Sequence, residues 1–229
     1  MNIVEQSVEL IDSMGSDLSV VNAARVSFHK ESRWKQDPSW FGNNVLDEKD
    51  QKLISYLAKH NHWTPFAHCF LSFRIKAPIF VARQLVKHQV GLAWNEVSRR
   101  YVDDEPEFWF PKEWRKRAEN VKQGSSAETL VPEDHNIWPK DSVSVMLMVY
   151  NDLLNAGVAP EQARMVLPQN MMTEWIWSGS LMAFARVCTL RLDPHAQKET
   201  QSIAIKIHDA VPKEFEHSWR ALIPDSVFE

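Results

Sequence analysis

Residues 68–78, HCFLSFRIKAP, alternate between apolar and polar side chains, and this stretch constrains the fold more than any other. One face carries Cys69, Leu71, Phe73 and Ile75. The other face carries Ser72, Arg74 and Lys76. A period of two is typical of a strand with one buried face, and such a strand needs partners in a sheet. Pro78 then suits the first turn of a helix, which we expect over 78–89.

Helix-forming residues with apolar positions at helical spacing outnumber such strand patterns. They predict helices over 46–60 and 142–157, the latter closed by Gly157, a helix from Pro160 to near Pro168, a helical 178–192, and a helix over 195–210 with Asp193 as its N-cap and Pro194 first. Two polar stretches, 29–44 and 112–141, read as loops. Because neither flank of the second has an independent core, we expect one domain over 1–229. The predicted class is mixed α/β (α+β), with a central sheet flanked by helices.

Composition excludes several classes of protein. The chain of 229 residues has a net charge of −4, which argues against general nucleic-acid binding. No apolar run approaches the ~18 residues that span a bilayer, and the acidic N-terminal segment is unlike a signal peptide, so we expect a cytoplasmic protein without membrane contact. Cys69 and Cys188 both lie in apolar runs, which is unlike a disulfide framework.

The stretch 83–101 concentrates positive charge in this mildly acidic chain. Its ionic and hydrogen-bonding residues are Arg83, Lys87, His88, Asn95, Glu96, Ser98, Arg99, Arg100 and Tyr101. Arginine forks match phosphate oxygens, and a carboxylate such as Glu96 accepts from a sugar hydroxyl or from a base or flavin N–H. Together they suggest a nucleotide site. The alternative is a solvated, charged helix end and turn.

Two further arginines stand out. Glu161 and Arg164 are three residues apart, so they share a helix face and could simply form an intrahelical ion pair. Arg191 follows an apolar segment, where it could pair with a carboxylate or stabilise an anion that develops on a carbonyl.

Seven strings occur in one order along most of the chain: NAARVSF (22–28), HWTPFAH (62–68), KAPIFVARQ (76–84), NEVSRRY (95–101), EQARMVLP (161–168), TEWIW (173–177) and LRLDPHAQ (190–197). In this order the chain resembles the flavin-dependent thymidylate synthases. The resemblance implies conversion of dUMP to dTMP, with methylenetetrahydrofolate as one-carbon donor, reduced FAD as hydride source and NADPH as reductant. It also implies a homotetramer whose active sites are built from several subunits.

The resemblance assigns roles to matching positions. The dUMP site would be lined by Gln84, Lys87, Glu96, Val97, Ser98, Arg99, Arg100, Arg164 and Arg191. Arg191 would be the catalytic residue, activating the uracil ring at N3. FAD would meet Ser27, His62, Thr64, Lys87, His88, Gln89, Glu96 and Ser180. A cation beside the N3–O4 edge of uracil can replace a cysteine nucleophile, and neither cysteine lies in the electropositive, accessible setting that a thiolate needs.

The chain departs from the family's signature, which is Arg-His-Arg, seven residues, then Ser. Here Lys87-His88-Gln89 is followed by eight residues and then Ser98, so two guanidinium groups are lost. The family also tends to place asparagine where this chain has Ser180 and Arg186, and by hypothesis Arg186 replaces the cation lost at Gln89. These changes leave three outcomes: a shifted FAD pose, weaker activity, or transfer of another one-carbon group, such as hydroxymethyl.

Other interpretations have weaker support. His60, His62 and His68 have a spacing that could suggest a metal, but we expect a helix end and a strand start to separate them, and so no metal site. The ten tryptophans lack a continuous basic groove for single-stranded nucleic acid. No G-x-G-x-x-G string supports a separate NADPH fold. A non-catalytic oligomeric scaffold with a basic patch is the remaining alternative.

Overall fold

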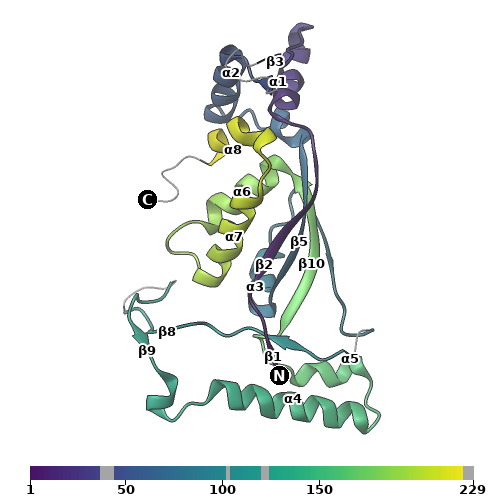
Figure 1. The fold of residues 1–229 in the computed structure, drawn as a ribbon, viewed down its shortest axis with the longest axis vertical. Coiled ribbons are helices and arrows are strands. Elements are labelled where there is room, and N and C mark those ends of the chain that lie inside the picture. Colours follow the sequence, from purple (N-terminus) through teal and green to yellow (C-terminus); the bar gives the residue numbers. More distant parts are fainter. Residues whose placement is uncertain (37–43, 102–103, 120–123, 224–229) are drawn as a thin grey trace.

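A four-stranded sheet is the centre of the molecule in the computed structural model, which describes residues 1–36, 44–101, 104–119 and 124–223 (Figure 1). Its strands are β2 (Ser7–Met14), β5 (Phe70–Pro78), β10 (Met172–Ser180) and β6 (Leu92–Glu96), in the order β2-β5-β10-β6. All three neighbouring pairs are antiparallel. The predicted strand is therefore confirmed as β5, one of the two central strands.

One face of this sheet is buried under helices. The predicted apolar face of β5 is confirmed, because Leu71, Phe73 and Ile75 are at most 1% exposed. On β10, Trp175 and Trp177 continue the same face, and the Trp175 ring stacks on Trp94 of β6 with ring centroids 4.2 Å apart. Burial of these aromatic rings contributes a large favourable free energy to folding, so we expect the sheet to be the most stable part of the fold.

Helices lie on one side of the sheet and at both of its ends (Figure 1). The side is covered by α6 (Leu181–Arg191), α7 (Lys198–Ala210) and α8 (Glu216–Leu222). One end carries α1 (Asp17–Arg25), η1 (Val26–Phe28), α2 (Glu48–Lys59) and η2 (Thr64–His68). The other end carries α4 (Pro139–Asn155), α5 (Pro160–Ala163) and η4 (Arg164–Val166). The helices predicted over 46–60, 142–157 and 178–192 are confirmed, with ends shifted by a few residues.

The remaining described elements are short. They are β1 (Asn2–Ile3), β3 (Lys35–Gln36), β4 (Asn44–Val45), α3 (Ile79–Leu85), β7 (Glu107–Phe108), β8 (Trp114–Arg115), β9 (Thr129–Leu130), η3 (Pro132–His135) and η5 (Lys213–Phe215). The two predicted loops therefore contain two small pairs of strands, β3–β4 and β8–β9, and the second loop gives way to α4 at Pro139. Residues 37–43 of the first loop lie outside the described part of the chain.

Three predicted helices have other boundaries than expected. The helix predicted from Pro160 to near Pro168 is α-helical only to Ala163 and continues as the 3-10 helix η4. The helix after Pro78 ends at Leu85 rather than continuing to 89, because the chain turns there, and the His88 amide donates to the Leu85 carbonyl at 3.0 Å. The helix predicted over 195–210 begins only at Lys198. Asp193 accepts from the His195 amide at 2.7 Å and so closes a local turn instead of capping a helix.

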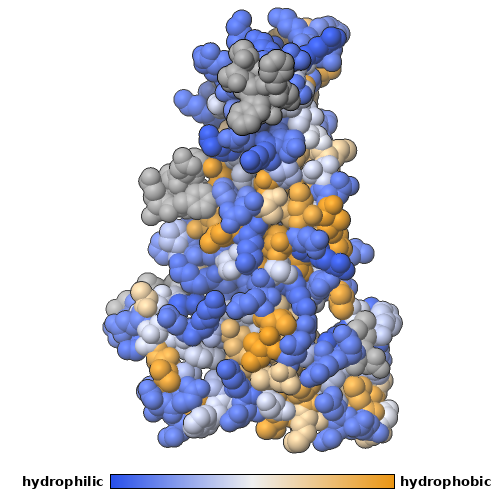
Figure 2. All heavy atoms as spheres, in the orientation of Figure 1, coloured by the Kyte–Doolittle hydropathy of each residue, from blue (hydrophilic) through white to orange (hydrophobic). Residues whose placement is uncertain are grey.

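The sheet face opposite the helices is polar and partly exposed. Ser72 and Ser178 share a hydrogen bond at 2.7 Å across β5 and β10, and Arg74 forms an ion pair with Glu174 at 2.7 Å. Apolar side chains break this polar surface, and Phe70 is 44% exposed there. Figure 2, in the orientation of Figure 1, shows hydrophobic patches among hydrophilic side chains over the face of the molecule in view. Among the described helices, none is both long enough and apolar enough to cross a bilayer.

Candidate functional site

Arg191 is the last residue of α6, and its side chain is hydrogen bonded to His88. The Arg191 Nε donates to His88 Nε2 at 2.9 Å. His88 lies in the connection from α3 to β6, and both side chains are half-buried. Burial, and secondarily the Arg191 charge, lower the pKa of His88, so its imidazole is held in the neutral form. The sequence predicts both residues as site residues but does not reveal their contact.

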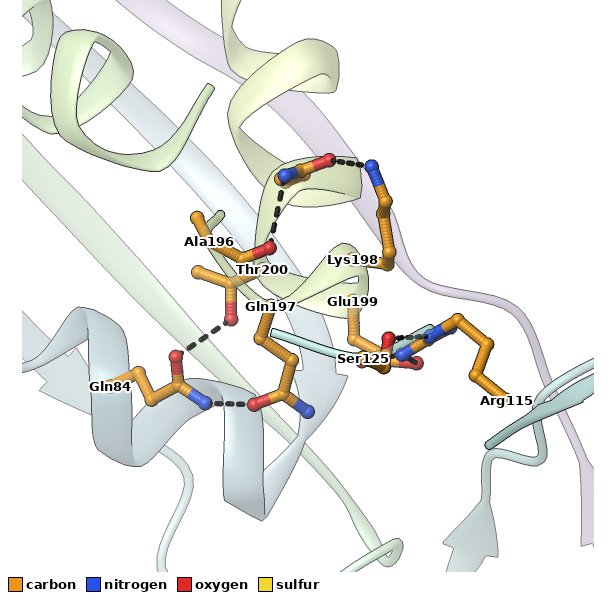
Figure 3. Close-up of polar contacts among 9 residues, drawn as sticks. Gln84, Arg115, Ser125, Ala196, Gln197, Lys198, Glu199 and Thr200 are labelled. Atoms are coloured by element: carbon orange, nitrogen blue, oxygen red, sulfur yellow. Dashed lines mark hydrogen bonds and ion pairs between the residues drawn. The ribbon is translucent and has the colours of Figure 1, made fainter. Parts of the chain in front are cut away.

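Gln84 on α3 is held by two side chains at the start of α7 (Figure 3). Its Nε2 donates to Gln197 Oε1, and its Oε1 accepts from Thr200 Oγ1 at 3.2 Å. These bonds orient the amide and leave it one further N–H and one lone pair for a ligand. Gln197 lies within the LDPHAQ string, whereas no signal in the sequence identified Thr200.

Lys87 and Gln89 flank His88 beyond the end of α3, and both side chains are exposed. Sequence reasoning placed Lys87 on the α3 surface four residues after Arg83, but the helix ends before Lys87. The directions of these two side chains are therefore set by the connection between α3 and β6 and not by helical spacing from Arg83.

A groove of about 570 Å³ gathers several predicted dUMP residues where β6 meets α5 and η4. Its lining includes Glu96, Val97, Arg99 and Arg164. The Arg164 Nε donates to the Glu161 carbonyl at 3.3 Å, so within the described residues no ion pair links this arginine to the Glu161 carboxylate. Its terminal nitrogens remain available for an anion.

Glu96 faces the tryptophans of the sheet. It accepts from Thr173 Oγ1 at 2.6 Å and from Trp94 Nε1 at 3.2 Å. These two donors fix the direction of its carboxylate, and a carboxylate has further lone pairs for a ligand.

The arginines after Glu96 are also held locally. Arg99 donates to the Asp104 carbonyl at 2.7 Å, and Arg100 Nε donates to Ser98 Oγ at 3.2 Å. The exposed guanidinium of Arg100 lies 4.9 Å from the centre of the Tyr101 ring. The predicted cationic segment therefore projects from the end of β6 as a short, polar turn.

A second, larger groove of about 1020 Å³ lies among α1, η1, α2 and η2. Its lining includes three predicted FAD residues, Ser27, His62 and Thr64. Among the described residues that line it, Arg25, Lys30, Lys49 and Lys52 are cations and none is a carboxylate. Aromatic rings line it too, among them Phe28, Tyr56 and Trp63. Positive charge beside aromatic surface suits an anionic ligand that has a planar ring.

Arg186 and Ser180 lie on or next to α6. The Arg186 guanidinium is 5.8 Å from the centre of the Trp63 ring, so it approaches the end of the second groove. Ser180 is buried, and its hydroxyl oxygen accepts from the Ala183 amide at 3.2 Å as the N-cap of α6. Its position is fixed by this structural role.

One chain does not bring all predicted site residues into one cavity. The groove with Arg164 and the groove with Ser27 share no lining residue, and their helices lie at opposite ends of the molecule (Figure 1). The predicted FAD residues are themselves divided, since Glu96 lines the first groove and His62 the second.

The cysteines and the histidine triplet offer no alternative chemistry in the described part of the chain. Cys69 and Cys188 are free thiols at 0% exposure. Burial raises the pKa of Cys69 to about 11 and raises that of Cys188 further, so neither forms a thiolate near neutral pH. Among the described residues, no three His, Cys, Asp or Glu side chains gather for a metal ion.

An aromatic pocket that the sequence did not predict lies beside Gln197. It measures about 450 Å³, and its lining includes Phe80, Trp109 and Trp114. Arg115 and Glu199 form an ion pair at 2.7 Å at its edge. The aromatic spacing in the sequence gave no periodic signal for this pocket.

Comparison with known proteins identifies the chain's relatives. Residues 9–216 match the family model described as thymidylate synthase complementing protein. The flavin-dependent thymidylate synthase of Thermosipho africanus is 37% identical over 206 residues, which cover 87% of this chain and 83% of that protein. The enzyme of the same name from Thermus thermophilus is 38% identical over 214 residues, covering 93% and 74% of the two chains.

A solved structure has the same fold. The UMP/dUMP methylase PolB from Streptomyces cacaoi, bound with 5-Br dUMP, superposes with a TM-score of 0.80 at 27% identity and covers 96% of each chain. A second structure of PolB, with 5-Br UMP, also has a TM-score of 0.80. The sequence strings and the tertiary structure therefore lead to the same group of proteins.

Proposed function

The chain belongs to the family of thymidylate synthase complementing proteins, and from this premise we propose that it converts dUMP to dTMP as a flavin-dependent thymidylate synthase. The observation that carries the proposal is Arg191, which is held at the end of α6 in a protein whose described thiols are both buried. A cation there can do the work that a cysteine nucleophile would otherwise do.

The residues present fit a flavin. The groove of about 1020 Å³ is lined by four cations, and aromatic rings there suit a planar ring system. Arg25 already pairs with Asp50 and Lys52 with Glu48, so Lys30 and Lys49 are the cations that we assign to a pyrophosphate. We assign Ser27, His62 and Thr64 to FAD, as the family resemblance implies. Bound, reduced FAD supplies the hydride, and NADPH and methylenetetrahydrofolate are the proposed co-substrates.

The proposed chemistry at the nucleotide is electrostatic. The Arg191 guanidinium lies against the N3–O4 edge of uracil and stabilises the negative charge that develops there when carbon 5 acts as the nucleophile. Arg164 offers its guanidinium fork to the phosphate, and Arg99 adds positive charge nearby while one of its nitrogens donates to the Asp104 carbonyl. Glu96 accepts from a sugar or base N–H or O–H. Positioning by fixed charges replaces a covalent adduct in this scheme.

We further propose that the complete site forms between subunits of a homotetramer. Two predicted halves of the site lie at opposite ends of one chain, which a second copy could bring together. The large apolar side chains next to predicted site residues are unusually exposed: Met165 81%, Tyr101 78%, Val90 77%, Phe28 74%. These side chains lie on different elements, and contacts with ligands or neighbouring subunits at each place would explain their exposure.

Product analysis tests the reaction. Purified protein is incubated with dUMP, methylenetetrahydrofolate, FAD and NADPH, and the nucleotide formed is identified by mass spectrometry. A product heavier than dUMP by one methylene group supports dTMP, whereas a hydroxymethyl mass would show the alternative one-carbon chemistry. Arg191→Ala should abolish turnover while FAD remains bound, as measured by flavin absorbance. Near-normal turnover in that variant contradicts the role of Arg191.

Subunit mixing tests the shared site. Arg191→Ala and Arg164→Ala proteins are each expected to be inactive, but together they should regain activity if one site takes these two arginines from different subunits. Random pairing would restore about one quarter of the sites. No recovery after verified subunit exchange would show that both arginines act within one chain.

A further inference from the structure

The contact between Arg191 and His88 has a fixed hydrogen-bond direction. A guanidinium group has five N–H donors and no acceptor, and it stays protonated in proteins. Because Arg191 Nε lies 2.9 Å from His88 Nε2, the imidazole nitrogen must supply the lone pair. His88 is therefore neutral, with its proton on Nδ1, whenever this bond is made.

The bond also determines which part of Arg191 remains available. It occupies the Nε–H. Within the described residues no hydrogen bond or ion pair engages the two terminal nitrogens, which form the outer edge of the planar group and can meet a ligand. A single bond at Nε limits rotation of the guanidinium plane. The edge that can meet a planar carbonyl therefore has a defined direction before a ligand arrives.

His88 is itself held in place. Its amide donates to the Leu85 carbonyl at 3.0 Å, which closes the turn after α3, and its side chain is half-buried. Its backbone is thus hydrogen bonded to the end of α3, while its side chain is hydrogen bonded to Arg191 at the end of α6. This arrangement can set the position of Arg191 more tightly than the final residue of a helix could by itself, since helix ends fray.

We propose that His88 is a positioning residue, which holds the Arg191 guanidinium in the orientation that receives the pyrimidine ring. This inference rests on the proposed function, because it concerns the residue that polarises uracil. It differs from the family-based expectation that His88 simply contacts FAD. Burial and the neighbouring charge lower the pKa of His88, which agrees with a neutral acceptor.

A double-mutant cycle separates the two roles. His88→Leu removes the acceptor at similar volume, and His88→Gln keeps an acceptor at a similar reach. Each change is made in wild-type and in Arg191→Ala protein, and dUMP affinity of the FAD-loaded protein is measured by calorimetry. The affinity for FAD is measured in parallel. His135→Ala serves as a control because this exposed histidine, at the end of η3, belongs to neither predicted binding set.

Positioning predicts a distinct pattern. His88→Leu should weaken dUMP binding about tenfold in wild-type protein, as expected for one lost hydrogen bond to a charged group. It should have less than about a twofold effect when Arg191 is already absent, because coupled residues are not additive. His88→Gln should recover most of the affinity, and His135→Ala should change nothing. The loss of kcat should rank the variants as the loss of dUMP affinity does: large in His88→Leu, small in His88→Gln and absent in His135→Ala.

Several results would overturn the inference. They are an equal loss of dUMP affinity in both backgrounds, a defect confined to FAD affinity, or no recovery in His88→Gln. If His88→Leu does not fold, His88→Asn provides the same comparison, because its shorter amide cannot reach Arg191. Wild-type protein that makes dTMP but shows an additive cycle would refute the positioning role alone. Wild-type protein that makes no dTMP would refute the proposed function instead.

Discussion

Arg115→Ala should destabilise the protein far more than an ordinary surface substitution. Arg115 on β8 forms an ion pair with Glu199 at the start of α7, and its Nη2 donates to both carboxylate oxygens, at 2.7 and 3.0 Å (Figure 3). Its Nε also donates to Ser125 Oγ at 2.7 Å. These contacts fasten the β8–β9 hairpin to the helix that orients Gln84 through Gln197 and Thr200.

The magnitude follows from burial. The Glu199 side chain is 7% exposed and the Arg115 side chain 26%. Removing one partner of a fully buried ion pair costs about 3–5 kcal/mol, because the other charge is left unpaired. Since solvent reaches part of Arg115, we expect a lower cost of about 2–3 kcal/mol. Truncating both partners should cost less than this, because no buried charge would then remain.

Urea denaturation at one fixed protein concentration measures the change, with the double variant Arg115→Ala/Glu199→Ala completing the cycle. Lys116→Ala is the matched control, because the neighbouring Lys116–Glu128 pair has the same ion-pair chemistry at 49% and 71% exposure. We expect only a small shift of the urea midpoint in this control. The reasoning is refuted if Arg115→Ala costs no more than Lys116→Ala, or if the double variant is the least stable of all.

Three further predictions concern the two thiols, His88 and Gly179. Cys69→Ser and Cys188→Ala should keep turnover, measured as dTMP formed, because neither buried thiol takes part in the reaction; loss of activity in a folded variant would contradict this. Burial, then the adjacent Arg191 charge, lowers the pKa of His88, so dUMP affinity should fall only when the pH drops below the usual histidine range of about 6.5, and His88→Gln should lack that loss. For the same reason the unfolded chain binds more protons than the folded one as the pH falls through this range, so acid should lower stability less in His88→Gln. Gly179→Ala should destabilise the protein by about 1–3 kcal/mol in urea denaturation, because its Cβ would lie 2.4 Å from the Gly91 carbonyl oxygen where β10 meets the start of β6, and an unchanged midpoint would show that this contact can relax.

Alternation and apolar spacing within a segment predicted those strands and helices that such a pattern specifies by itself. The strand at Phe70–Pro78 was predicted from its alternation, and the helix at Glu48–Lys59 from its apolar spacing. The strand at Met172–Ser180 was missed, although buried Trp175 and Trp177 alternate with less buried neighbours. That alternation is visible only in the structure, because in the sequence the apolar Ile176 stands between the two tryptophans.

Helix ends were less predictable because the turns next to each helix decide where it begins or ends. The helix after Pro78 stops at Leu85, although the sequence contains helix formers beyond it. The turn at Asp193 delays α7, and Gln201 stabilises that turn by donating to the Asp193 carbonyl at 2.6 Å. These bonds join residues two to eight positions apart, so they compete locally with a longer helix, and apolar spacing does not show which of the two forms.

The sequence by itself determined the chemical types at the site: its cations, the carboxylate of Glu96 within the nucleotide segment, and two cysteines placed among apolar residues. It also determined the family, since the order of short strings is a property of the chain alone. Only the tertiary structure decided which of these groups meet. The pairing of Arg191 with His88 spans 103 residues, and the two grooves lie at opposite ends of the sheet. Contacts over such separations depend on how the helices pack on the sheet, and no local spacing encodes that geometry.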